Sequence, residues 1–273
     1  MADIQYPPAR PLSVGEVLDL CVRIYRRTLV KCLVLAGLAV LAGQLPNIYN
    51  LAHGRYLVKG MTAFRDPVYD LMYVLAILLS TVLYGSVLLR QHALITGQPQ
   101  GGELRAALRR VPAWIALLLL CGLGFGLPFA LLSAVLHSVV FATLCLVLAV
   151  TYFGIAFSCA WPLLFVKGTG PLQSLERSWQ LTRGSFWRLT GLYTVAVLIL
   201  CAVGLVFGVV SVSLGVIIGH GDVLLAGSTA SLLAVAGGAL LAPFYTGLAL
   251  AALGDLRVRR EGADLEQRIA ATA

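Results

Sequence analysis

The sequence has few charged residues for its length. Asp, Glu, Lys and Arg make up 12% of its 273 residues, whereas hydrophobic residues make up 59%. Soluble globular domains carry roughly 25% charged residues, because their surfaces face water. The composition therefore excludes a soluble globular protein and indicates a chain that is embedded in lipid.

Charge is missing altogether from long stretches of the chain. A helix needs about 20 predominantly apolar residues to cross a bilayer. Six stretches without Asp, Glu, Lys or Arg meet or approach this length: residues 32–49, 71–89, 113–136, 139–166, 192–218 and 223–253. The sequence predicts an all-α fold, in which a six-helix transmembrane bundle forms a single membrane domain over residues 1–273 and ends in a tail of residues 254–273.

The chain also lacks the motifs of common enzymes and cofactor sites. It contains no G-x-S-x-G, no P-loop, no H-E-x-x-H and no Gly-rich dinucleotide fingerprint. None of its six cysteines lies in a C-x-x-C pair or in a predicted outer loop, so neither zinc nor a disulfide framework is indicated. We expect a protein that is not an enzyme and has no cofactor. A membrane-embedded enzyme without a recognisable motif is the weaker alternative.

The charges that are present lie mostly on one side of the predicted spans. Of the 20 Lys and Arg residues, 17 precede the first span, follow the last or lie in alternate connections, and the exceptions are Arg55, Lys59 and Arg65. The positive-inside rule therefore predicts that both termini are cytoplasmic. The same rule accounts for the net charge of +8 without a nucleic-acid partner.

Three amphipathic stretches precede predicted hairpins on this cytoplasmic side: residues 13–30, 103–111 and 172–189. The first begins with Ser13 and Glu16 in the capping-box pattern of a helix start. Each contains an acidic residue and, two helical turns later, an arginine on the same face. The pattern predicts three repeats, each an in-plane amphipathic helix followed by a transmembrane hairpin.

Three histidines occupy equivalent places at the predicted outer ends of the hairpins. They are His53, His137 and His220, and Asp222 follows the last. Imidazole and carboxylate are common metal ligands, so an outer metal site is one hypothesis. The alternative, histidines that cap helix ends at the interface, requires no convergence of the three side chains. No metal ion is therefore assigned.

Two cytoplasmic segments resemble a known family. Residues 170–188 read GPLQSLERSWQLTRGSFWR, residues 255–266 read DLRVRREGADLE, and residues 11–16 also fit. They resemble an uncharacterised bacterial family of polytopic membrane proteins, similar to the membrane domain attached to some glycerophosphodiester phosphodiesterases. Family tails often carry aromatic residues before the Asp, where this chain has Leu253 and Gly254.

The resemblance implies a multi-pass protein of the bacterial inner membrane with a role in lipid or envelope homeostasis. It does not imply phosphodiesterase activity, because the six spans leave no room for that soluble catalytic domain.

The cytoplasmic charges are candidates for binding a membrane surface or a partner protein. Each positive charge near an anionic membrane surface strengthens binding to it by about 1 kcal/mol. Trp179 and Trp187 are predicted interface anchors. The candidates for docking a lipid or a partner protein are Arg177, Arg183, Arg188, Asp255, Arg257, Arg259, Glu261 and Asp264.

Two functions fit these patterns. A lipid-binding or envelope-scaffold protein needs a lateral apolar opening with arginine at its mouth, whereas a permease or transport-system subunit needs a polar path through the bundle. No ionisable residue lies deep in a predicted span, which disfavours a proton-coupled pump. We expect the first function, with membrane lipids as partners and another membrane or cytoplasmic protein as a second class of partner.

Overall fold

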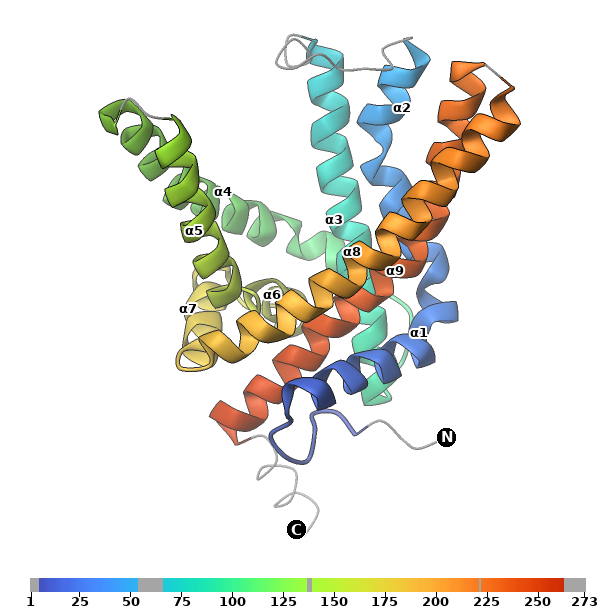
Figure 1. Ribbon diagram of the computed structural model, residues 1–273. Helices are drawn as coiled ribbons and strands as arrows, with labels where there is room; N and C mark the ends of the chain where they lie inside the picture. The colour runs from blue at the N-terminus through green and yellow to red at the C-terminus, as the bar shows by residue number, and fades with distance from the viewer. Residues whose placement is uncertain (1–4, 54–65, 137–138, 221, 263–273) are drawn as a thin grey trace. The chain divides into compact units, whose positions relative to one another are not determined.

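The computed structural model describes residues 5–53, 66–136, 139–220 and 222–262, and its regular elements in these ranges are all helices (Figure 1). This confirms the all-helical prediction. In chain order the helices are α1 (Val14–Gly43), α2 (Leu45–Ala52), α3 (Pro67–Thr96), α4 (Glu103–Leu136), α5 (Val139–Ala156), α6 (Ala160–Lys167), α7 (Pro171–Thr182), α8 (Phe186–Gly219) and α9 (Val223–Glu261).

Several of these helices have the length and composition of membrane spans. Over the described ranges five stretches qualify, one of which, Thr143–Lys167, runs through α5 and α6. A sixth results if α1 and α2, which meet at a bend of 50°, count as one. Within each of the five, at most 33% of the most apolar window is buried in the protein. Apolar faces without protein cover are expected where the surrounding medium is hydrocarbon. The helices are those of a multi-pass membrane protein.

The start of α1 follows the predicted capping box. The Ser13 amide donates to the Glu16 carboxylate at 2.7 Å, and the Glu16 amide donates to Ser13 Oγ at 3.3 Å. However, α1 continues through the boundary expected between the amphipathic stretch 13–30 and the span 32–49, because no Pro or Gly interrupts that part of the helix. It ends at Gly43, since Pro46 has no amide to donate to the carbonyl four residues earlier. The bend therefore falls inside the predicted first span.

Other boundaries differ for related reasons. Helix α4 includes both the amphipathic stretch 103–111 and the span 113–136, with Pro112 and Pro128 inside it. The predicted span 139–166 is divided into α5 and α6, because Pro162 has no amide for the carbonyl of Ser158. Helix α9 continues past Leu253 to Glu261, so the predicted tail begins as two further helical turns. Of the three predicted in-plane helices, only α7 is a separate element.

The chain forms two compact units. Unit 1 comprises residues 1–20, 108–193 and 249–273, and unit 2 comprises residues 21–107 and 194–248. In unit 2, Gln91 is fully buried and donates to Thr28 and to the Pro243 carbonyl, while its own carbonyl accepts from Thr246. This neutral cluster ties together the segments of α1, α3 and α9 that belong to unit 2.

Unit 1 contains the break between α5 and α6 and the short helix α7. The carbonyl of Ala156, at the end of α5, accepts hydrogen bonds from Ser178 and Thr182 of α7, each at 2.9 Å. Carbonyls at a helix end have no hydrogen-bond partner within the helix, so these hydroxyls supply the missing donors at the end of α5. The small side chains on this face of α7 thereby fix α7 against α5.

Candidate functional site

An apolar cavity of about 510 Å³ lies in unit 1 among α4, α5 and α7. Helix α4 contributes Leu120, Cys121, Gly124, Pro128 and Phe129, α5 and the turn after it contribute Cys145, Leu146, Ala149, Phe153 and Phe157, and α7 contributes Leu175. The lining contains no charged side chain. Its volume lies within the range of small-molecule sites, which is about 300–1,000 Å³.

The cavity exists because small residues face one another across it. A Cβ atom on Gly124 would meet no other heavy atom within 4 Å, so the space beside it is open. Cys121 on the same helix and Cys145 and Ala149 on α5 also carry short side chains. Interdigitating larger residues would fill such a gap, since protein interiors are normally close-packed.

Aromatic rings form one end of the cavity. Phe153 and Phe157 stack with their ring centroids 5.8 Å apart, and the Trp179 ring lies 6.5 Å and 6.2 Å from them. Trp179, a predicted interface anchor, therefore packs against α5 and the turn after it. Trp187, the other predicted anchor, is 83% exposed at the start of α8.

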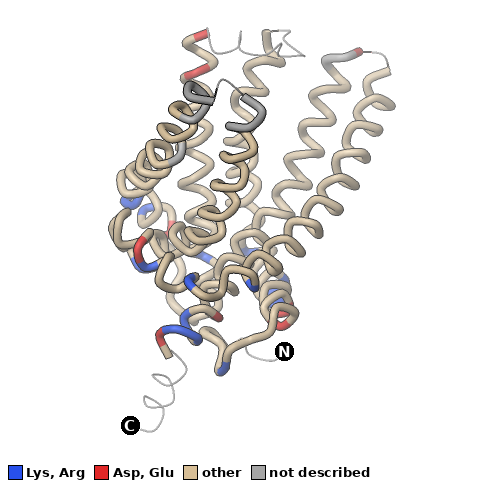
Figure 2. The backbone as a smooth tube through the Cα atoms, turned by 60° about the vertical axis from the view of Figure 1, so that its left-hand side comes forward, with Lys and Arg blue, Asp and Glu red and all other residues tan. Residues whose placement is uncertain are grey.

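The described charged groups of unit 1 do not line this cavity. Figure 2 shows α5 without a blue or red segment along its coloured length, which agrees with the absence of Asp, Glu, Lys and Arg from residues 139–166. The charged residues of unit 1 instead precede α4's apolar stretch, surround α7 or occupy the chain ends. Unit 1 thus combines an apolar cavity with a separate charged region.

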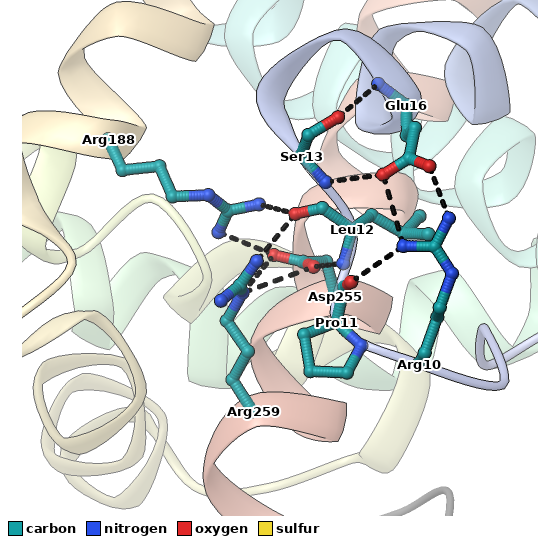
Figure 3. Close-up of polar contacts among 8 residues, drawn as sticks. All are labelled: Arg10, Pro11, Leu12, Ser13, Glu16, Arg188, Asp255 and Arg259. Atoms are coloured by element: carbon teal, nitrogen blue, oxygen red, sulfur yellow. Dashed lines mark hydrogen bonds and ion pairs between the residues drawn. The ribbon is translucent and has the colours of Figure 1, made fainter.

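The most buried carboxylate of this charged region belongs to Asp255, whose exposed fraction is 1%. Figure 3 shows it between the guanidinium groups of Arg188 and Arg259 and beside the Leu12 peptide. Asp255 accepts from the Leu12 amide at 2.7 Å, from Arg188 at 2.6 Å and from Arg259 at 3.2 Å. Both arginines also donate to the Leu12 carbonyl at 2.5 Å. The cluster therefore holds the amino-terminal segment, α8 and α9 together.

The amino-terminal segment also packs directly on α9. The Tyr6 hydroxyl donates to the Leu250 carbonyl at 3.1 Å, and burial raises the pKa of this hydroxyl, although the charge of Arg257 lowers it. A Cβ atom on Gly254 would lie 2.8 Å from the Tyr6 ring. A larger residue than glycine at position 254 would therefore collide with the segment that crosses it.

A second carboxylate, that of Glu261 at the end of α9, lies close to three cationic side chains. It accepts from Arg177 at 2.6 Å and from Arg257 at 2.9 Å, and the Lys167 ammonium lies 3.8 Å away. Glu261 lies beyond the predicted span, which ends at Leu253. Burial opposes its ionisation, but hydrogen bonds from Arg177 and Arg257 and the nearby positive charges outweigh burial and lower its pKa.

The predicted docking residues are thus mostly bonded within the chain. Arg177, Arg188, Arg257 and Arg259 bind Asp255 or Glu261, and the carbonyl of Arg183 accepts a hydrogen bond from Arg260. Asp264 lies outside the described residues. The docking role of this set stays a prediction. The sequence did not suggest three contacts of this region: the Leu12 peptide with Asp255, Tyr6 with the Leu250 carbonyl, and the α7 hydroxyls with the Ala156 carbonyl. The only signal for them was the polar character of Tyr6 and of the hydroxyl side chains.

Arg110 of α4 differs from the other arginines of unit 1. Its side chain is half-buried, and its Nη1 atom is buried and donates no hydrogen bond within the described ranges. Gly168, the residue after α6, packs beside it, and a Cβ atom there would lie 3.5 Å from Arg110 Nη2. Arg109, its neighbour in the chain, is exposed.

The outer histidines do not reveal a metal site. Where residues are described, no group of three His, Cys, Asp or Glu side chains is arranged to hold a metal ion. His53, His220 and Asp222 are exposed in unit 2. His137 lies outside the described residues.

No protein-family model, curated protein or solved structure matches this chain. The family resemblance of residues 170–188 and 255–266 stays a prediction. A functional conclusion therefore depends on the cavity and on the charges of unit 1.

Proposed function

We propose that this chain is a non-enzymatic, multi-pass protein of the bacterial inner membrane that binds a membrane lipid. The observation that carries the proposal is the apolar cavity among α4, α5 and α7, which accepts one acyl chain of the lipid. The segments that resemble a bacterial membrane family support this location. The excess of Lys and Arg on one side of the spans supports cytoplasmic termini.

The lining of the cavity favours hydrocarbon over water. A buried water molecule needs about two to four polar partners, and the polar side-chain atoms of this lining are two thiols. The helices that enclose the cavity have largely exposed apolar faces, so lipid chains are the neighbouring molecules. An acyl chain that enters the cavity gains dispersion contacts that an empty space lacks. Because the lining offers no polar path, it does not favour a permease.

The proposal keeps α7 as an in-plane helix beside the lipid. Leu172 of α7 is 68% exposed, and its neighbour on the same face, Leu175, lines the cavity. The polar residues Gln173, Glu176 and Arg177 of α7 line a pocket of about 330 Å³. A helix with both kinds of residue suits the boundary between acyl chains and head groups.

Filling the cavity tests the proposal. Gly124→Leu should place a side chain in the open space, and Gly122→Leu is its matched control, because Gly122 lies on α4, has no heavy atom within 4 Å of its Cβ position and does not line the cavity. Both substitutions improve helix propensity by several tenths of a kcal/mol up to about 1 kcal/mol, so both chains should fold. Native mass spectrometry of protein extracted in mild detergent would count the lipids bound to each variant.

We expect the wild type and Gly122→Leu to retain one enriched lipid and Gly124→Leu to lose it. Ala149→Phe, which fills the cavity from the α5 side, should give the same loss. Equal lipid retention in the wild type and both cavity-filling variants would overturn the proposal.

A further inference from the structure

The unpartnered guanidinium of Arg110 indicates a second element of the lipid site. In unit 1 the arginines of comparable burial, Arg177, Arg188 and Arg257, each donate to a carboxylate. Arg110 has no such acceptor among the residues that the structure describes, although its Nη1 atom is buried. Burying a charged group without a hydrogen-bonding partner is costly, so an acceptor from outside the chain is expected.

The surroundings of Arg110 favour an anion as that acceptor. Its neighbour in the chain is Arg109, so a second positive charge lies on the same turn of α4. The carboxyl end of α6 offers partial negative charge, which favours the position of the guanidinium. However, no backbone carbonyl of the described residues accepts from Nη1. Gly168 lies beside the guanidinium but has no side chain that could accept a hydrogen bond from it.

The chemistry of the guanidinium selects phosphate. Its planar fork of donors matches two oxygens of a phosphate group, and such charge-assisted hydrogen bonds are about twice as strong as neutral ones. A carboxylate is the other anion that fits this fork. Phosphate is favoured here because membrane phospholipids present it at the boundary where in-plane helices lie.

Arg110 also lies at a suitable distance from the cavity. Leu120, the first cavity residue of α4, follows Arg110 by ten residues, which corresponds to about 15 Å along a helix. A phospholipid whose acyl chain occupies the cavity therefore has its phosphate within reach of the Arg110 end of α4. This step rests on the proposed lipid-binding function.

We infer that Arg110 binds a phosphate group, and that the phosphate belongs to the lipid whose chain occupies the cavity. The site thus has two parts on one helix, the apolar wall from Leu120 onwards and the cation that precedes it. The lipid selected is one whose phosphate is accessible, as in phosphatidylglycerol.

The test compares two adjacent arginines. Arg110→Gln and Arg109→Gln remove the same charge from neighbouring positions, and only Arg110 has a buried, unpartnered nitrogen atom. Titration of the purified protein with phosphatidylglycerol, followed by native mass spectrometry, should show about 10- to 100-fold weaker binding for Arg110→Gln, because the variant loses the charge-assisted hydrogen bonds of the guanidinium. Arg109→Gln should stay within about twofold of the wild type, and Arg110→Lys should fall between the two.

Inorganic phosphate distinguishes the two sources of the anion. If millimolar phosphate leaves phosphatidylglycerol binding unchanged, the site belongs to the lipid head group, as expected. If phosphate alone binds the wild type, and not Arg110→Gln, as tightly as the lipid does, the head-group assignment is overturned. Equal lipid binding by Arg110→Gln and Arg109→Gln would overturn the phosphate site altogether.

The outcome for Gly124→Leu separates this inference from the proposed function. If Gly124→Leu loses the lipid while Arg110→Gln keeps it, the cavity proposal stands and the Arg110 site fails. If Gly124→Leu keeps the lipid while Arg110→Gln loses it, the cavity proposal fails. Thermal unfolding of each variant checks that it is folded before binding is compared.

Discussion

Within unit 1, the charged groups of Asp255 and Arg110 differ in their hydrogen-bond partners. Asp255 is bonded by two guanidinium groups and a backbone amide, all from the chain itself. Arg110 is half-buried and has no acceptor among the described residues. The first charge holds segments of the fold together, whereas the second is the one for which we propose a ligand.

The comparison changes how arginines near a predicted membrane surface should be interpreted. Their number and their place in the sequence favoured Arg177, Arg188, Arg257 and Arg259 as docking residues. In the structure these side chains hold carboxylates of α9. Pairing within the chain, which depends on the fold, decides which arginine is available.

Removing the paired carboxylate should have the largest effect. Asp255→Ala removes the carboxylate that Arg188, Arg259 and the Leu12 amide share, and breaking a buried ion pair of this kind costs about 3 kcal/mol. Denaturant titration in detergent micelles would measure the loss in the free energy of unfolding. Glu176→Ala is the control, because Glu176 is exposed and bonds only to Gln180 in the contacts described. Equal losses in the two variants would contradict a special role for Asp255.

Displacing the amino-terminal segment should have the next largest effect. A side chain at Gly254 collides with the Tyr6 ring, and overpacking a close contact costs about 1–3 kcal/mol. We expect Gly254→Val to release residues 6–12 and to speed chymotryptic cleavage after Leu12. Gly191→Val in α8 is the control, because its Cβ position has no neighbour within 4 Å. Unchanged cleavage in Gly254→Val would show that the segment is held without this contact.

Loosening α7 should have a smaller effect on stability and a clear effect on the lipid site. Ser178→Ala and Thr182→Val each remove a hydrogen bond to the Ala156 carbonyl, at about 1 kcal/mol per bond. The double variant should bind lipid more weakly, because α7 supplies Leu175 to the cavity. Native mass spectrometry would measure the bound lipid, with Ser174→Ala as the control, since its hydroxyl bonds only near the start of α7. Full lipid retention in the double variant would separate α7 from the site.

The sequence predicted those features that depend on neighbouring residues. Long apolar stretches predicted the helices, and Ser13 with Glu16 predicted the start of α1. The sequence could not predict that Asp255 pairs with Arg188, because these residues are 67 positions apart and other arginines were equally plausible partners. The cavity was also beyond prediction. Gly124 and Ala149 are visibly small, but only the fold shows that no neighbouring side chain fills the space between their helices.

Acid should weaken the Glu261 contacts, which is the smallest effect expected. Because the pKa of Glu261 is lower in the folded protein than its ordinary value of 4.5, its carboxylate stabilises the fold above that pH. This contribution is lost as the pH falls below 4.5 and through the lowered pKa. Thermal unfolding of the wild type and Glu261→Gln between pH 7 and pH 3 should therefore show a difference that shrinks with acid, since the variant cannot ionise. A constant difference across this range would mean that Glu261 stabilises the end of α9 by packing, and that its bonds to Arg177 and Arg257 contribute nothing that protonation removes.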